Sequence, residues 1–331
     1  MKIFNKKGYC NIPGILSLGA PFNFVVGARG TGKTYTSLLY AIEHKVEFIF
    51  MRRTQAQVDI IGRKEFSPFK KLEHDLGIEI ECKKISQYTT GFYMNDELIG
   101  IAVALSTFSN LRGFSSMAEL LIYDEFIPER HERPIKDEGA AFLNCIETIN
   151  RNRELEGNKP ITVLCLANSN DIGNPLFMEL DLINIAEKLK RSDKLYYWNH
   201  ERGLVLVDLK DSPISEKKKE TALYKLVKDS QFKKMAIENE FIDDTIAIIQ
   251  SKSLKEYTPL VTIADVTIYE HKSEKLFYVS EHYSGTPERF STASADITQF
   301  RRKYYYLWSY YLGKKIIFEN KLCSVVFEKL W

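Results

Sequence analysis

One stretch near the amino terminus constrains the fold more than any other. The apolar run Phe22–Val26 has the β-branched and aromatic residues of a buried strand. It leads directly into Gly27-Ala28-Arg29-Gly30-Thr31-Gly32-Lys33-Thr34, which fits the pattern G-x-x-x-x-G-K-[ST]. A helical pattern then runs from Thr34 to about Glu43. This order of strand, glycine-rich loop and helix predicts a phosphate-binding turn within an α/β fold.

Each residue type in this loop has a physical role in holding phosphate. The glycines let the backbone curl until successive N–H groups point inward at phosphate oxygens. Lys33 supplies positive charge for the β- and γ-phosphates, and the Thr34 hydroxyl is a ligand for Mg²⁺. The helix that follows directs the positive end of its dipole at the anion. We therefore expect every residue from Gly27 to Thr34 to contact a nucleotide, with ATP and Mg²⁺ as the cofactors.

A second predicted strand ends in two acids. Glu119–Tyr123 is a short apolar run, and Asp124 and Glu125 follow it. We expect Asp124 to hold Mg²⁺, directly or through water, opposite the Thr34 hydroxyl. Glu125 is then placed to orient and polarise the water that attacks the γ-phosphate. The second acid favours an ATP-hydrolysing enzyme over a small-molecule kinase or a slow GTP switch, and the sequence contains no N-K-x-D motif for guanine.

Two further strand ends carry polar side chains. Arg52 and Arg53 follow the predicted strand Val46–Met51. Ligands of open α/β sheets bind outside the carboxyl ends of strands, so this pair is either nucleotide-binding or a pair of solvated surface arginines. Asn168 follows the predicted strand Ile161–Ala167. It can sense the γ-phosphate or hold the attacking water, or it can simply belong to a turn.

A predicted helix over Gly139–Arg153 ends in two arginines near the rim of this site. Arg151 or Arg153 can act as an arginine finger for a neighbouring subunit, which is worth several orders of magnitude in rate. Ion pairing with Glu147 or Glu154 is the alternative for both. On the residues alone the two alternatives stay open.

The bulk properties limit the class of protein. The chain has 331 residues, which is enough for two domains with separate cores. Its net charge of +2 means that binding to a polyanion needs local basic patches. The five cysteines lack C-x-x-C spacing, which is typical of reduced thiols in a cytosolic protein. No apolar run is long enough to span a membrane, so we expect no membrane contact.

We expect three parts along the chain: a P-loop ATPase domain over residues 1–200, a helical linker over 201–240, and a small α+β domain over 241–331. In the chain, Val46–Met51 comes between the phosphate-loop strand and the two-acid strand. This extra strand favours the RecA-like (ASCE) class, with a mainly parallel sheet. Gly203–Leu209 reads as an edge strand.

Three other segments have two interpretations each. The polar stretch Ser106–Ser116 is a loop over the nucleotide or into a pore, or a plain surface loop. The lysine-rich stretch Glu216–Glu240 is a solvated helix or a contact for nucleic-acid phosphates. An aromatic stripe on the predicted helix Ile297–Leu312 is core or a base-stacking platform. Beside it lies a basic cluster that suits nucleic acid, formed by Arg301, Arg302, Lys303, Lys314 and Lys315.

With these residues placed, the sequence resembles the DNA-packaging ATPases (encapsidation proteins) of podovirus-type bacteriophages, small relatives of the large terminase motors. The resemblance covers most of the first 200 residues and rests on Phe24–Thr34, Ile122–Phe126, Asn150–Glu154 and Cys165–Asn168. It implies a homopentameric ring in the host cytoplasm, transiently at the portal vertex of the procapsid. There the ring would use ATP to push double-stranded DNA into the capsid, with a structural packaging RNA as a further partner.

The resemblance also implies residue roles. Lys33 and Thr34 take the phosphates and the metal, Asp124 the metal, and Glu125 the water. Arg151 becomes the trans-acting finger, and Asn168 couples hydrolysis to movement. One departure concerns a further basic residue that the family tends to carry beyond Arg53, where this chain has the neutral Thr54-Gln55-Ala56.

For the carboxy-terminal domain the resemblance implies a vestigial RNase H-like nuclease. The obvious acids of this region, Asp265, Glu270 and Asp296, do not form a convincing two-metal cluster. Two alternative functions remain: a large-terminase-type enzyme with an active nuclease, and a nucleotide-regulated RNA-binding or scaffold protein with little turnover.

Overall fold

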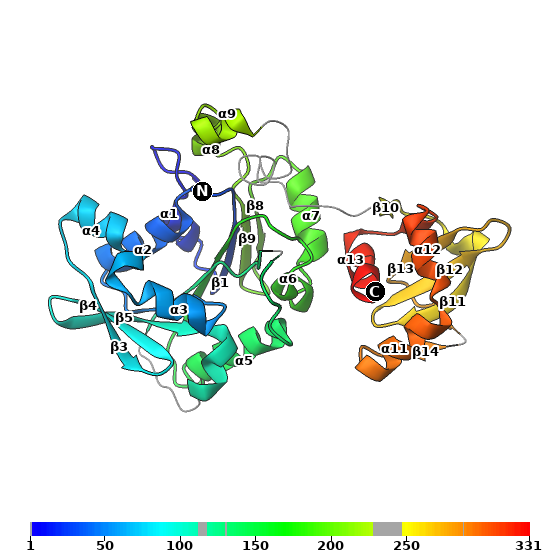
Figure 1. Ribbon diagram of the computed structural model, residues 1–331, viewed down its shortest axis with the longest axis horizontal. Helices are drawn as coiled ribbons and strands as arrows, with labels where there is room; N and C mark the ends of the chain where they lie inside the picture. Colours follow the sequence, from blue (N-terminus) through cyan, green and yellow to red (C-terminus); the bar gives the residue numbers. More distant parts are fainter. Residues whose placement is uncertain (1, 112–117, 130, 228–246, 287) are drawn as a thin grey trace. The chain divides into compact units, whose positions relative to one another are not determined.

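The computed structural model of the protein describes residues 2–111, 118–129, 131–227, 247–286 and 288–331. The described residues form two compact units. The first contains the residues up to Leu180 together with Lys188–Val227. The second contains Asp181–Glu187 and residues 247–331. Each unit has its own sheet (Figure 1).

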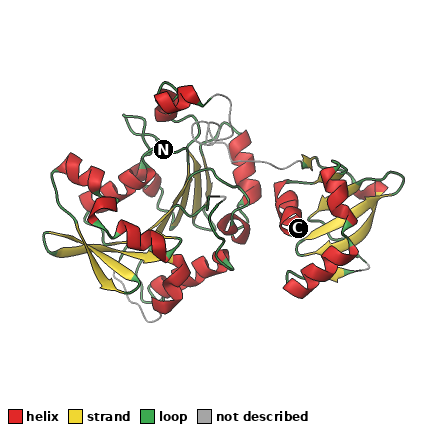
Figure 2. Cartoon of the chain, in the orientation of Figure 1, coloured by secondary structure: helices red, strands yellow, loops and turns green. Residues whose placement is uncertain are grey.

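The first unit combines strands and helices (Figure 2). Its sheet has nine strands in the order β3-β4-β5-β2-β6-β7-β1-β9-β8. Its strands are β1 (Phe22–Val26), β2 (Phe48–Arg52), β3 (Glu81–Ser86), β4 (Thr89–Met94), β5 (Glu97–Ala104), β6 (Leu120–Asp124), β7 (Thr162–Ala167), β8 (Tyr196–Asn199) and β9 (Leu204–Asp208). The neighbours from β5 across to β9 pair in parallel. The pairs β3–β4, β4–β5 and β8–β9 are antiparallel. The predicted α/β class with a mainly parallel sheet is therefore confirmed.

The strand order corrects one detail of the prediction. One strand does separate the phosphate-loop strand β1 from the acidic strand β6, but it is β7, which ends at Ala167, directly before Asn168. β2, the strand that separates them in the chain, lies on the other side of β6. The ends of β1, β7 and β6 are consequently adjacent, which brings the phosphate loop, Asn168 and Asp124 to one edge of the sheet.

Helices cover both faces of this sheet. The helices of this unit are α1 (Ile12–Leu16), α2 (Lys33–Glu43), α3 (Gln55–Ile61), α4 (Lys70–Leu76), α5 (Glu138–Asn150), α6 (Pro175–Glu179), α8 (Pro213–Lys218) and α9 (Ala222–Leu226), with short 3₁₀ helices at Lys64–Phe66 and Leu105–Leu111. α7 (Ile183–Arg191) is divided between the two units, because its residues up to Glu187 belong to the second. Successive strand residues point to opposite faces. Val25 packs in one core with Leu38 of α2, whereas Phe24 meets Phe177 of α6. Because both faces are covered, the central strands are nearly continuous runs of buried apolar residues.

Part of the predicted linker belongs to the sheet. β9 is fully buried and lies between β1 and β8, so Gly203–Leu209 is not an edge strand. The border expected at residue 200 therefore falls inside the sheet of the first unit. Of the helical stretch expected over Glu216–Glu240, α8 and α9 account for residues up to Leu226, and residues 228–240 lie outside the described residues. The same holds for residues 112–116 of the polar stretch Ser106–Ser116.

The second unit has a six-stranded mixed sheet with the order β10-β15-β13-β12-β11-β14. Its strands are β10 (Ile248–Ile249), β11 (Tyr257–Ile263), β12 (Val266–His271), β13 (Phe277–Ser280), β14 (Arg289–Phe290) and β15 (Ile316–Phe318). Its helices are a 3₁₀ helix at Leu254–Glu256, α11 (Ser294–Lys303), α12 (Tyr306–Leu312) and α13 (Lys321–Lys329). The similarity of this unit to an RNase H-like nuclease stays a prediction.

The predicted helix over Ile297–Leu312 is two helices, because α11 ends at Lys303 and α12 begins at Tyr306. Its aromatic stripe belongs to the core, as Phe300 and Tyr311 are 0% and 5% exposed. In the neighbouring basic cluster, Arg301 donates to the Leu330 carbonyl and Lys303 pairs with Glu288. Nucleic-acid binding by this cluster stays a prediction. In the part of the chain that the structure describes, no helix combines the length and the apolar character that crossing a membrane requires.

Candidate nucleotide-binding site

The loop between β1 and α2 has the curled backbone that its glycines allow. Gly30 and Gly32 have φ angles of 70° and 85°, in the left-handed region that only glycine enters at little cost. α2 begins at Lys33 directly after the loop, so its first N–H groups face the loop. A cavity of about 340 Å³ lies there, lined by Arg29, Gly30, Thr31, Gly32, Lys33, Thr34, Tyr35, Asp124, Glu125, Ala167 and Asn168.

Lys33 is held inside the curl of this loop. Its side chain is buried, and its ammonium donates to the carbonyls of Gly27 and Ala28, at 2.8 and 3.0 Å. The ammonium also donates a hydrogen bond of 3.2 Å to Oδ1 of Asn168, the residue that follows β7. Burial lowers the pKa of Lys33 to about 8, which leaves the group mostly charged at pH 7. Because these partners are neutral oxygens, an anionic phosphate can replace them at the ammonium. Gly27 and Ala28 thus serve the site through their carbonyls and do not line the cavity.

Thr34 and Asp124 meet across the cavity. The Thr34 hydroxyl lies 3.1 Å from each carboxylate oxygen of Asp124, which is itself 5% exposed. One residue starts α2 and the other ends β6, so the strand order described above creates this contact. Hydroxyl and carboxylate oxygens are hard ligands of the kind that Mg²⁺ takes. The residues at this point therefore fit the ion that the sequence predicts.

Arg52 binds both acids of the site. Its Nη1 and Nη2 atoms lie 2.9 Å from Asp124 and 2.9 Å from Glu125. The Arg52 side chain is only 15% exposed, so it is not a solvated surface arginine. Its Nε is buried and bonds to nothing among the described residues. Arg52 thus neutralises two adjacent carboxylates that face the cavity.

Glu125 occupies a strained position immediately after β6. Its φ angle is 58°, a conformation that costs a non-glycine residue energy and is found most often at functional sites. The side chain is 50% exposed and lines the cavity. Burial raises the pKa of the Glu125 carboxyl, while Arg52 opposes that shift. Because the side chain is half exposed, a water molecule from solvent can reach the carboxylate.

The sequence predicts that Arg53 either binds the nucleotide or is solvated, and the structure shows that both alternatives are wrong. Its side chain is 0% exposed, and its Nε and Nη2 atoms bond to the two carboxylate oxygens of Glu138 at 2.7 and 2.9 Å. Nη1 binds Glu132 at 2.9 Å. Successive residues at a strand end point to opposite faces, so Arg52 meets Asp124 and Glu125 while Arg53 meets Glu138 of α5. Arg53 joins elements of the fold and does not reach the nucleotide site.

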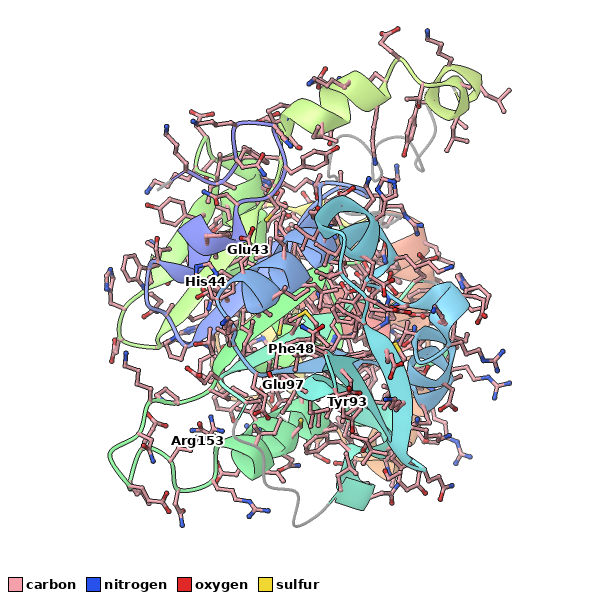
Figure 3. The ribbon with its side chains drawn as sticks, turned by 90° about the vertical axis from the view of Figure 1, so that its left-hand side faces the viewer. Glu43, His44, Phe48, Tyr93, Glu97 and Arg153 are labelled. Carbon is pink, nitrogen blue, oxygen red and sulfur yellow. The ribbon has the colours of Figure 1, made fainter. Side chains whose placement is uncertain are left out.

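The two arginines at the end of α5 differ in their surroundings. Arg151 is exposed at the helix end, where its Nε donates to the carbonyl of Thr148 at 3.2 Å. Arg153 lies on the loop that follows α5 (Figure 3) and donates to the carbonyl of Ala118 at 2.8 Å. Neither lines the phosphate cavity of its own chain. A role in this site therefore has to come from a second copy of the chain.

Two contacts around the phosphate loop had no signal in the sequence. The Arg29 side chain pairs with Glu129, and the ammonium of Lys218 in α8 donates to the Arg29 carbonyl. Glu129 is 100 residues away in the chain and Lys218 is 189 residues away. Only the folded arrangement of these elements reveals these contacts.

Comparison with known proteins identifies the family. The chain matches the sequence profile of the Podovirus DNA encapsidation protein (Gp16) over residues 4–323. It belongs to this family. It is 24% identical to the DNA packaging protein of Bacillus phage PZA, and the match covers 99% of this chain and 98% of that protein. The DNA packaging protein of Bacillus phage phi29 is 23% identical, with the same shares covered.

Solved structures show that the encapsidation-protein fold extends over the whole chain. A chain of the bacteriophage Phi-29 viral genome packaging motor assembly has a TM-score of 0.68 at 19% identity, covering 99% of this chain and 98% of that chain. The Phi-28 gp11 DNA packaging motor has a TM-score of 0.65 at 18% identity, covering 97% and 96%. The resemblance drawn from the sequence motifs is confirmed.

Proposed function

We propose that this protein is an ATPase that drives double-stranded phage DNA into a preformed capsid, with ATP and Mg²⁺ bound between the phosphate loop and the end of β6. One observation carries the proposal. The Thr34 hydroxyl contacts both oxygens of Asp124 at 3.1 Å beside a buried lysine, in a chain that belongs to a DNA encapsidation family. The cavity that they share is within the size range of small-molecule sites, which starts at roughly 300 Å³.

The residues of the chain can bind and orient the reactants. Backbone N–H groups of the loop and the Lys33 ammonium hold the phosphate oxygens. Thr34 and Asp124 would hold Mg²⁺, which when bound neutralises the charge of the phosphates. Glu125 accepts a hydrogen bond from a water molecule and orients it toward the γ-phosphate. The raised pKa of Glu125 makes its ionised form a better proton acceptor than an ordinary carboxylate.

The site is completed by a neighbouring subunit in a homo-oligomeric ring, for which the family resemblance suggests five copies. Arg151 is the better finger, because it is exposed at the end of α5 while Arg153 is half-buried. Asn168 senses the γ-phosphate through its bond to Lys33 and couples hydrolysis to movement through β7.

The partners follow from the same proposal. They are double-stranded DNA, the portal protein and capsid, and a structural packaging RNA, at the portal vertex of the procapsid in the host cytoplasm. The second unit contributes a vestigial nuclease fold and its basic cluster. Its described residues contain no group of three or more His, Cys, Asp or Glu that could hold a metal ion.

The test combines phosphate release with DNA packaging into purified procapsids. Wild-type protein is expected to hydrolyse ATP and to protect DNA from nuclease inside capsids. Arg151→Ala and Glu125→Gln are each expected to abolish both activities, and mixed rings to recover part of them, because an intact Glu125 then meets an intact Arg151 across some interfaces. No phosphate release by wild-type protein with DNA and procapsids overturns the proposal. Packaging that survives in Glu125→Gln favours a scaffold, and cutting of plasmid DNA favours a terminase with an active nuclease.

A further inference from the structure

The phosphate loop is supported on its outer side by α8. Lys218, the last residue of α8, donates from its ammonium to the backbone carbonyl of Arg29. A Cβ atom on Gly30 would collide with this ammonium, so Lys218 lies directly against the loop. The described residues that line the cavity do not include Lys218. Its position is therefore that of a support for the loop and not that of a phosphate ligand.

The direction of the Arg29 carbonyl determines where the next N–H group points. A trans peptide group is planar, and its C=O and N–H point in opposite directions. With the Arg29 carbonyl directed at Lys218, the N–H of Gly30 points away from α8. The Thr31 carbonyl is held in the same way by the N–H of Cys10, at 2.8 Å, which directs the N–H of Gly32. Both glycines line the cavity, so these two N–H groups belong to an anion-binding concavity.

We propose that Lys218 is a positioning residue for the phosphate loop, and that bound nucleotide in turn fastens α8 to this loop. The inference rests on the proposed function, since it concerns the same site. When the Gly30 N–H donates to a phosphate oxygen, the carbonyl of the same peptide group becomes a stronger acceptor for Lys218. Phosphate and Lys218 therefore stabilise each other, and the effect of each on the other is equal.

The charge balance around Lys218 supports this coupling. Burial and the nearby Arg29 lower the pKa of Lys218, so the protein environment disfavours its charge. A triphosphate adds negative charge on the other side of the same peptide group. The charged ammonium is then better compensated, and its bond to Arg29 becomes stronger.

The start of α8 has its own attachments. The Ser212 hydroxyl donates to the Gly8 carbonyl at 3.4 Å, and Pro213 packs close to Gly8. Replacing Lys218 therefore releases only the end of the helix that touches the phosphate loop. In the chain, α8 and α9 are the last described elements before residues 247–331.

The test compares full-length wild type with Lys218→Gln, Lys218→Arg and the control Lys217→Gln. Lys217 is exposed on the same helix, and its replacement changes the charge equally. Two quantities are measured: the Kd of a non-hydrolysable ATP analogue with Mg²⁺, and hydrogen exchange over residues 213–226 with and without that analogue. For wild type and Lys217→Gln we expect nucleotide to slow exchange in this segment. Lys218→Gln is expected to bind roughly tenfold more weakly, as for the loss of a charged hydrogen bond, and to lose the slowing. Lys218→Arg keeps the positive charge and is expected to retain much of the affinity for the analogue and much of the slowing of exchange.

Other outcomes would contradict either the proposed function or the positioning role of Lys218. If wild type does not bind the analogue, the proposed function fails and the inference with it. If wild type binds and Lys218→Gln shows the same Kd and the same nucleotide-dependent protection, Lys218 has no positioning role while the proposed function stands. Equal losses in Lys217→Gln and Lys218→Gln would reduce the effect to general charge and overturn the inference. Lys218→Met, which keeps the aliphatic stem, replaces Lys218→Gln if that variant does not fold.

Discussion

Replacing Arg53 by methionine separates a structural role from a nucleotide-binding role. The Arg53 guanidinium is 0% exposed and bonds to both oxygens of Glu138, which is also 0% exposed, and to Glu132. Methionine has a similar length but no charge. It leaves the Glu138 carboxylate buried without its partner, and breaking a buried ion pair in this way costs roughly 3–5 kcal/mol of unfolding free energy.

The expected change is large enough for a thermal scan. In a unit of roughly 150–250 residues each kcal/mol moves the melting temperature by about 2–4 °C, so we expect a fall of about 6–20 °C. Urea unfolding followed by tryptophan fluorescence gives the free energy directly. The double variant Arg53→Met with Glu138→Leu is expected to regain much of the loss, because an apolar replacement of a buried pair is often neutral.

Arg63 is exposed, and Arg63→Met is expected to change the stability by no more than about 0.5 kcal/mol. If Arg53→Met kept the wild-type unfolding free energy and lost ATP affinity instead, Arg53 would be a nucleotide ligand. The assignment of its guanidinium to Glu138 would then be wrong.

Three further predictions concern the site itself. Glu125→Gln is expected to bind ATP with wild-type affinity and to lose at least about a hundredfold in hydrolysis rate, measured as phosphate release, because an amide is a poor proton acceptor. Arg151→Ala is expected to lower the rate by roughly a thousandfold or more in assembled rings while ATP binding by isolated subunits stays unchanged, whereas a larger loss in Arg153→Ala would identify Arg153 as the finger. Lys33 has a pKa of about 8, and bound phosphate raises it, so ATP binding takes up a proton and weakens as the pH rises above about 8. Titration calorimetry in two buffers of different ionisation enthalpy, just above pH 8, measures that uptake, and its absence contradicts the burial of Lys33.

The sequence predicted those parts of the site whose signals are local. The loop from Gly27 to Thr34 is a contiguous motif with its strand and helix beside it. Asp124 and Glu125 end an apolar strand, so their place at the carboxyl edge of the sheet followed from the chain alone. β7 and Asn168 were found in the same way, although the strand order could not be read from the chain because it depends on where each crossover helix returns.

The parts that were missed depend on contacts between distant residues. Whether Arg52 or Arg53 pairs with the two acids of the site is decided by the alternation at the end of β2 and by Glu138, which lies 85 residues beyond Arg53. The sequence predicts an edge strand at Gly203–Leu209, because apolar residues alone do not reveal that strands pair on both sides of β9. Lys218 stands in a lysine-rich stretch, where composition cannot separate one cation that meets the phosphate loop from its solvated neighbours.

The most direct test of the central claim is a structure of the full chain with a non-hydrolysable ATP analogue and Mg²⁺. The account predicts the triphosphate inside the loop from Gly27 to Thr34, with Lys33 on its β- and γ-phosphates. It also predicts the metal between the Thr34 hydroxyl and Asp124. An empty cleft at saturating analogue, or a triphosphate bound elsewhere on the chain, would contradict it.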